Sequence, residues 1–307
     1  MKFAFAFPYQ RITRYQSYCQ HETFADLVRR ADAWGFDAAT AGDHLFMPNY
    51  WKRVATEVWF DPFTFLGYVA GITGLKVITD IVVVPYRTPF HTAKAVATLD
   101  FMTGGRVIFG AGVGYLEGEF NTLNVPFRER GPMTDEYLEI MKVLWTEDNP
   151  RYEGKYFRVA DITFWPKPAQ KPHPPIWIGG RTGPSIRRAV RYGDGWIPFN
   201  LDLAGLHRAL ELFEELWETS GGRKEGFQIV MRAERINVTS QPIKSVERQP
   251  FWGSPEQIIE DVQRYIDAGA TYLIASFQGY ELEEHMENME RFAMEVMPHF
   301  AERGSGQ

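Results

Sequence analysis

Short runs of apolar, largely β-branched residues alternate along the chain with longer segments in which apolar residues recur every three or four positions. The short runs predict strands that are buried on both faces, and the longer segments predict amphipathic helices that cover them. The expected strands are 2–7, 38–41, 76–84, 107–109, 176–178, 195–199, 228–238 and 272–276. A helical segment follows each strand, so the pattern is one helix between successive strands.

Eight strands alternating with eight helices predict an α/β fold, the (β/α)8 TIM barrel. A doubly wound open sheet would carry its glycine motif after the first strand, where this chain has Pro8. We expect one barrel domain over residues 1–307. Three insertions are expected in it, near 45–61, 146–175 and 239–252. Residues 151–168, inside the second insertion, alternate aromatic and polar side chains and predict a β-hairpin.

The formal net charge of -6 and the single cysteine narrow the functions to consider. No run of Lys or Arg offers a surface for nucleic acid, and no apolar run approaches the roughly 20 residues that span a membrane. Because Cys19 has no partner for an internal disulfide, we expect a cytoplasmic protein. No spacing of His and carboxylate residues resembles a metal site, so no metal is expected.

The active site of such a barrel lies at the carboxyl ends of its strands, so the residues just after each strand are candidates for chemistry. His44 follows the second strand and can exchange a proton near neutral pH. The adjacent Asp43 can hold the tautomer of His44 or bind the N–H of a heterocycle. After the fourth strand come closely spaced glycines, which let backbone approach a flat or anionic ligand, and then Glu117 and Glu119. Both glutamates are candidate catalytic residues, and a solvated loop or a helix start is the more common explanation for such a pair.

The fifth strand leads into a second glycine-rich segment, 179–183, directly before a helix. Its free amides and the positive helix end suit a phosphate, and Arg181 can assist. Arg187 and Arg188 extend this positive charge along the helix. Together, the residues after these strands predict a cofactor that lies across the barrel mouth, with its ring near His44 and its phosphate near residue 179.

A long loop after His44 is rich in aromatic residues, among them Phe46, Trp51, Trp59 and Phe60. Such side chains either plug the core or hold an apolar substrate above the barrel. The pattern leaves both roles open.

Three segments resemble the bacterial luciferase-like monooxygenase superfamily, and within it the oxidoreductases that depend on the deazaflavin coenzyme F420. They are RADAWGFDAATAGDHL at 30–45, the run 82–120, and PIWIGGRTGPSIRRAVRYGDGWIP at 175–198. The resemblance implies that His44 faces the reactive ring with Asp43 beside it. It also implies a non-proline cis peptide bond near Ile81 and Val82 that supports the ring. The residues that the resemblance places at the cofactor are Ile81, Val82, Gly112, Val113, Gly114, Gly179, Gly180 and Arg181.

The resemblance further implies a homodimer that uses coenzyme F420 to transfer a hydride to or from a small organic substrate. Two other functions stay open: a monooxygenase that uses reduced FMN and O2, and a flavin-binding barrel without catalysis. Sugar-phosphate dehydrogenases of the superfamily carry a catalytic Glu directly after these glycines, where this chain has Tyr115. We therefore do not expect sugar-phosphate oxidation.

Overall fold

The computed structural model describes residues 1–8, 20–47, 49, 59–279 and 281–301. Within these residues, eight parallel strands close into a barrel, because β12 pairs with β1 and β9 pairs with β10. In order around the barrel they are β1 (Lys2–Ala6), β2 (Ala38–Ala41), β3 (Lys76–Thr79), β5 (Val107–Gly112), β8 (Ile176–Gly179), β9 (Gly195–Ile197), β10 (Gln228–Val238) and β12 (Tyr272–Phe277). The predicted (β/α)8 barrel is confirmed.

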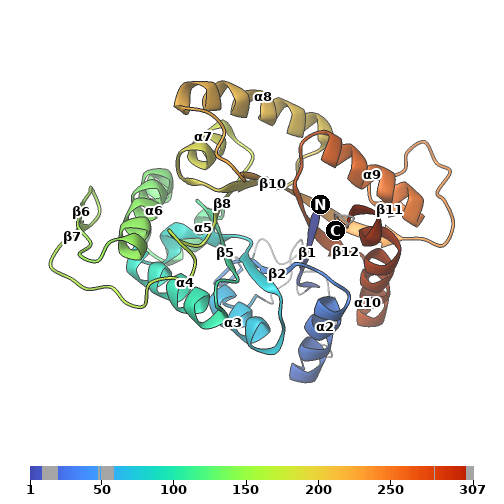
Figure 1. The fold of residues 1–307 in the computed structure, drawn as a ribbon, viewed down its shortest axis with the longest axis horizontal. Coiled ribbons are helices and arrows are strands. Elements are labelled where there is room, and N and C mark those ends of the chain that lie inside the picture. Colours follow the sequence, from blue (N-terminus) through green and yellow to red (C-terminus); the bar gives the residue numbers. More distant parts are fainter. Residues whose placement is uncertain (9–19, 48, 50–58, 280, 302–307) are drawn as a thin grey trace, which may run out of the picture.

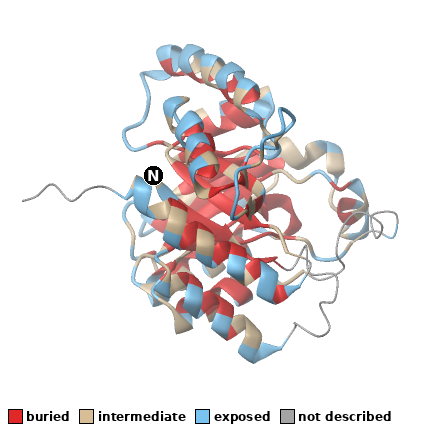
Figure 2. Cartoon of the chain, turned by 90° about the vertical axis from the view of Figure 1, so that its right-hand side faces the viewer, coloured by how far each residue is buried: buried red, intermediate tan, exposed pale blue. Residues whose placement is uncertain are grey.

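Helices surround the strands (Figure 1). The long ones are α2 (His21–Ala33), α3 (Pro62–Ile72), α4 (Pro89–Thr103), α6 (Arg130–Thr146), α7 (Gly183–Tyr192), α8 (Leu203–Ser220), α9 (Pro255–Asp267) and α10 (Leu282–Arg291). Side-chain caps fix several of their starts; the Asp61 carboxylate, for example, accepts from the Thr64 amide at 2.9 Å. Buried residues gather in the strands and on the inward sides of the helices, and exposed residues line the outer sides (Figure 2). None of the helices in the described ranges is both long and apolar enough to cross a bilayer.

A separate apolar cluster fills the inside of the barrel, apart from the larger core between strands and helices. Successive side chains of a strand point to opposite faces, so only every second residue can join it. Its members come from all eight barrel strands: Ala4, Ala38, Ile78, Ile108, Trp177, Ile197, Val230, Tyr272 and Ile274. This layer closes the barrel lumen and separates its two ends.

The expected strand 76–84 is wrong in its second half. β3 ends at Thr79, and Asp80 then turns into the lumen, where its carboxylate pairs with Arg232 of β10. The peptide bond between Asp80 and Ile81 is cis, as the resemblance implied. β4 (Val82–Val83) then pairs with β5, and a 3-10 turn follows at Val84–Tyr86.

Two further elements differ in extent from the sequence predictions. The expected hairpin exists as the short antiparallel pair β6 (Tyr152–Glu153) and β7 (Arg158–Val159). The last helix is not continuous, since α10 passes into a π turn over Phe292–Val296 and a 3-10 turn over Met297–Phe300. Pro298 lies in the final turn and cannot continue an α-helix, because it lacks an amide hydrogen.

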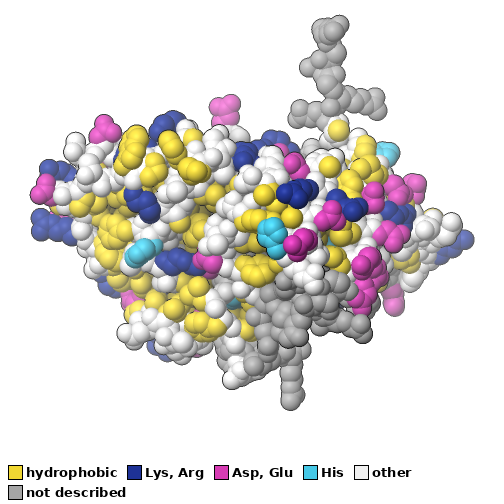
Figure 3. All heavy atoms as spheres, turned by 90° about the horizontal axis from the view of Figure 1, so that it is seen from below, with side chains coloured by type: hydrophobic (Ala, Val, Ile, Leu, Met, Phe, Trp, Pro, Cys, Tyr) yellow, Lys and Arg dark blue, Asp and Glu magenta, His cyan; other side chains and the backbone are white. Residues whose placement is uncertain are grey.

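The molecular surface is mixed in charge. On the face shown in Figure 3, basic and acidic side chains are interspersed with apolar ones and do not gather into one basic area.

Replacement of Gly110 by alanine tests the close strand packing in this barrel. A Cβ atom at Gly110 would lie 1.9 Å from the backbone oxygen of Thr79, which cannot move aside without distorting β3. We expect Gly110→Ala to lower the free energy of unfolding by about 2–3 kcal/mol. Gly71→Ala is the control, because a Cβ there meets no atom within 4 Å, and it should raise stability by up to about 1 kcal/mol. Equal urea midpoints for the two variants would contradict this packing.

Candidate active site

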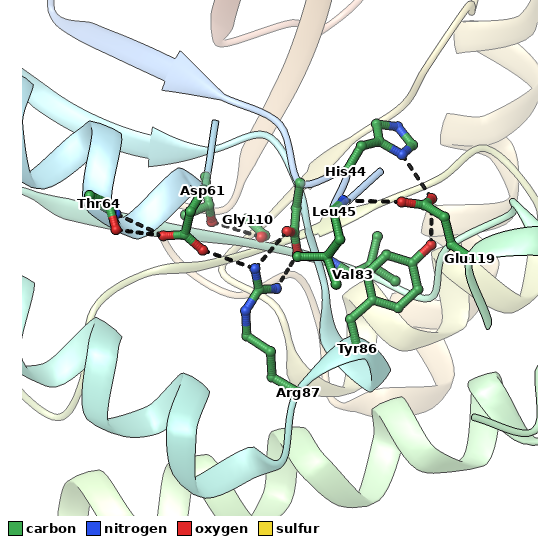
Figure 4. Close-up of polar contacts among 11 residues, drawn as sticks. His44, Leu45, Asp61, Thr64, Val83, Tyr86, Arg87, Gly110 and Glu119 are labelled. Atoms are coloured by element: carbon green, nitrogen blue, oxygen red, sulfur yellow. Dashed lines mark hydrogen bonds and ion pairs between the residues drawn. The ribbon is translucent and has the colours of Figure 1, made fainter. Parts of the chain in front are cut away.

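His44 and Glu119 meet at the carboxyl ends of the strands. His44 follows β2, and Glu119 lies in the short helix α5 (Glu117–Thr122) that follows β5. His44 Nδ1 is 2.9 Å from Glu119 Oε2, and the side chains are 12% and 0% exposed, respectively (Figure 4). Of the two glutamates predicted near the site, Glu119 contacts His44 and Glu117 is exposed.

Two other donors fix the buried Glu119 carboxylate. The Leu45 amide donates to Oε1 at 3.1 Å, and the Tyr86 hydroxyl donates to Oε2 at 2.7 Å. Burial and the nearby Glu119 charge raise the pKa of Tyr86, so Tyr86 keeps its proton and remains a donor. Because a carboxylate offers only acceptor atoms, we assign the Nδ1 proton of His44 to the bond with Glu119, which leaves Nε2 on the far side of the ring (Figure 4).

Aromatic side chains surround His44. The ring of Trp59 lies edge-on to it with centroids 4.4 Å apart, and that of Tyr115 does so at 5.9 Å. Tyr115 is 63% exposed, so it borders the open side of the site. Phe60 instead stacks on Phe65 in the core. Phe60 therefore packs in the core, Trp59 packs against His44, and a substrate-binding role for this loop stays a prediction.

Cys19 and Trp51 lie outside the described residues.

The side chain of Asp43 binds Arg87 and not the ring of His44, as the sequence had suggested it could. Both of its oxygens accept from Arg87, at 2.6 and 2.9 Å, and one also accepts from the Val83 amide at 3.0 Å. Burial raises the pKa of the Asp43 carboxyl, while the Arg87 guanidinium and the Val83 amide oppose that shift. Arg87 also binds Asp61 at 3.1 Å, which ties the end of β2 to the start of α3. A catalytic role for Asp43 stays a prediction.

The glycines of β5 and β8 accommodate Ile81. A Cβ atom at Gly112 would lie 1.9 Å from Ile81 Cδ1, and one at Gly179 would lie 2.4 Å from the same atom. Gly114 has a φ of +77° and packs against Val83 and Phe120. Internal packing therefore accounts for these glycines without a ligand. Cofactor contacts by these glycines, and by the buried Val82 and half-buried Val113, stay predictions.

The second glycine-rich segment forms the entry to α7. Gly180 has a φ of +118°, a left-handed conformation that favours glycine, and its amide donates to the Ile197 carbonyl at 3.1 Å. Arg181 is exposed, and its guanidinium reaches the Asn200 carbonyl at 2.9 Å. Arg187 is exposed too, but Arg188 is buried and pairs with Asp135 of α6 at 2.5 Å. The expectation that Arg188 extends a cationic groove is therefore wrong.

The sequence interpretation missed two features of the site. Tyr86 was not singled out, although it lies just after the third strand, where active-site residues are expected. The ion pair of Arg232 with Asp80 spans the lumen, because β10 and β3 are four strands apart in either direction around the barrel. Arg232 also binds Glu234 at 3.0 Å. Charged residues at inward positions of apolar strands are the signal that could have revealed this pair.

The closed parallel barrel, with His44 held by Glu119 at the carboxyl ends of the strands, has the architecture of the TIM-barrel class of proteins. The chain belongs to the luciferase-like monooxygenase family, whose model matches residues 1–237. Members of this family are flavin- or F420-dependent oxidoreductases, and we place the chain among them.

Relatives with both types of cofactor are similar to this chain. The F420-dependent glucose-6-phosphate dehydrogenase of Kineococcus radiotolerans is 27% identical over 327 residues, covering 89% of this chain and 91% of the relative. The FMNH(2)-dependent dimethylsulfone monooxygenase of Pseudomonas putida is 34% identical over 141 residues, covering 45% of this chain and 39% of the relative. The crystal structure of the monooxygenase RslO1 from Streptomyces bottropensis has a TM-score of 0.82 at 21% identity, covering 98% of this chain and 100% of that one. At this identity, the similarity to the crystal structure shows that the two proteins share a fold.

Replacement of Glu119 tests whether its carboxylate holds this side of the site together. In Glu119→Gln, one carboxylate oxygen becomes an NH2 group, which donates and does not accept. The side chain can then no longer accept from both the Leu45 amide and the donors at Oε2 in the present geometry. We expect the free energy of unfolding to fall by about 2–3 kcal/mol, measured by urea unfolding. Glu117→Gln, two residues earlier on the same helix but exposed, should change stability by less than about 0.5 kcal/mol. Similar losses in both variants would argue against a special role for Glu119.

Proposed function

We propose that this enzyme binds coenzyme F420 and catalyses hydride transfer to or from a small organic substrate, with His44 as the acid–base residue. The observation that carries the acid–base part of the proposal is the partly buried bond between His44 Nδ1 and Glu119 Oε2. An imidazole held in one tautomer at the mouth of a barrel is what proton exchange with a bound substrate requires. Family membership and the F420-dependent relative support the redox chemistry.

The role of the protein is to orient and to move a proton. Neutral His44, with Nδ1–H bonded to Glu119, presents the lone pair of Nε2 and can accept a proton; protonated His44 can return it. The Glu119 carboxylate lies 2.9 Å from Nδ1 and holds the imidazole ring in its orientation. The bound cofactor supplies the hydride chemistry at its ring.

The residues at the barrel mouth fit a flat ring with an anionic chain. Half-buried Ile81 offers an apolar side chain, and Tyr115 offers an exposed aromatic one. At the start of α7, the exposed Arg181 adds its charge to the positive end of a ten-residue helix. We therefore propose Ile81 and Tyr115 for the ring and Arg181 for the phosphate, with Gly180 giving the backbone its turn.

A monooxygenase that uses reduced FMN and O2 is the second candidate. Its support is the 34% identity to the dimethylsulfone monooxygenase over 141 residues, a higher identity over a shorter segment than that of the F420-dependent relative. The same His44 and Glu119 would serve it, so the cofactor distinguishes the two candidates. We propose F420 because the chain aligns with that relative over most of its length.

Replacement of His44 by alanine tests the acid–base assignment. We expect turnover to fall at least tenfold, which corresponds to about 1.4 kcal/mol of barrier, while cofactor affinity changes little. Steady-state kinetics and a fluorescence titration of the cofactor measure the two quantities separately. Unchanged turnover would remove His44 from the mechanism. Glu214→Gln, at an exposed position of the outer helix α8, is the control in which both quantities should stay as in the wild type.

Titration with F420 and with FMN, followed by fluorescence quenching, tests the choice of cofactor. F420 carries an anionic tail beyond its phosphate, so Arg181→Gln should weaken its binding and flatten the salt dependence of the affinity. Arg187→Gln removes an exposed charge from the same helix and is the matched control, with a smaller effect expected. Tight FMN binding without measurable F420 binding would reject our choice and favour the monooxygenase.

A further inference from the structure

A cavity of about 630 Å³ opens at the amino-terminal end of the barrel, opposite the candidate active site. Inward-facing residues at the starts of four strands, Lys2, Lys76, Gln228 and Tyr272, contribute to its lining. Ile108 and Trp177 of the apolar layer inside the barrel also border it. Because that layer closes the lumen, the cavity is separate from the barrel mouth at which His44 lies.

The two carboxylates that line the cavity are already neutralised. Asp37 accepts from Lys76 Nζ at 2.7 Å and from the Tyr272 hydroxyl at 2.6 Å. Asp194 pairs with Lys224, and its second oxygen accepts from the Ile176 amide at 2.8 Å. Each carboxylate therefore offsets one lysine.

Positive charge remains in excess in the cavity. Its lining also includes Lys2, Arg106 and Lys171, and no carboxylate among the described residues forms a salt bridge with any of them. The Arg106 guanidinium donates to carbonyl groups at the end of α3 and nearby, including Ala70 at 2.8 Å and Leu75 at 2.7 Å. These carbonyl groups accept hydrogen bonds from Arg106 but carry no net charge, so the positive charge of Arg106 is not neutralised. The chain as a whole has a net charge of -6, so this cavity is a region of positive charge on a negatively charged protein.

We propose that this cavity binds a small organic anion that carries two or more carboxylate or phosphate groups. Lys2 and Lys171 are exposed, and their flexible side chains can turn toward such a ligand, although Lys171 Nζ now donates to the Pro168 carbonyl at 3.1 Å. Arg106 adds to the attractive field. Trp177 and Tyr272, whose rings lie edge to face with centroids 5.1 Å apart, give the inner end of the cavity an apolar surface for the carbon skeleton. This site is independent of the proposed redox function.

Isothermal titration calorimetry of the full chain with citrate and, separately, with inorganic pyrophosphate at low ionic strength tests the site. We expect saturable binding of one anion for at least one of the two probes, because they represent the carboxylate and the phosphate source. In Lys2→Gln/Lys171→Gln the affinity should fall about threefold to tenfold, since each exposed charge contributes modestly. Arg208→Gln/Lys244→Gln removes two exposed cations that do not line the cavity and should bind as the wild type does.

A second variant probes the cavity wall without touching a lysine. Gln228→Glu is nearly isosteric and keeps an acceptor for the Thr271 hydroxyl, which lies 3.0 Å from Gln228 Oε1, but it loses the donor that bonds the Gly226 carbonyl at 2.7 Å. It adds a negative charge inside the cavity and should weaken binding at least as much as the lysine pair does. Gln249→Glu adds the same charge at an exposed position that does not line the cavity and should leave the affinity unchanged. Absence of saturable binding for both probes, or equal affinity in the cavity variants and their controls, would overturn the proposal.

Discussion

The candidate site depends on one buried carboxylate. Glu119 is withdrawn from water, so its oxygens must receive hydrogen bonds from the protein. Its three donors belong to the loop after β2 and to the turn after β4, so the requirement joins α5 to both segments. A single carboxylate thereby fixes the local chain path and the orientation of His44.

The barrel lumen is divided into an apolar layer and two polar ends. The apolar cluster of all eight strands closes the middle, and the Arg232 and Asp80 pair crosses the lumen between β10 and β3. A buried ion pair of this kind contributes little net stability but is costly to break, because either partner alone would be an uncompensated charge. The proposed active site and the proposed anion site therefore lie at opposite ends of the barrel, separated by the apolar layer.

The fold was accessible from the sequence because its signal is periodic and repeated. Alternating strands and helices predicted the barrel, and the position of His44 after the second strand predicted its place at the mouth. The sequence could not predict which of Glu117 and Glu119 contacts His44. Both lie in one polar segment, and only tertiary packing buries Glu119. Likewise, Asp43 was assigned to His44 because they are adjacent in sequence, whereas its actual partner Arg87 lies 44 residues away. Glycines at 112 and 179 suggested a ligand, yet a side chain of the chain itself, Ile81, fills the space beside them.

The central claim is that Glu119 holds neutral His44 with its proton on Nδ1 and leaves Nε2 free for proton exchange. Nitrogen-15 NMR of the ring of His44 in the full chain, at a pH where the imidazole is neutral, reports directly which nitrogen carries the proton. The structure predicts a protonated Nδ1 and an unprotonated Nε2. A proton on Nε2, with Nδ1 acting as the acceptor, would contradict the account.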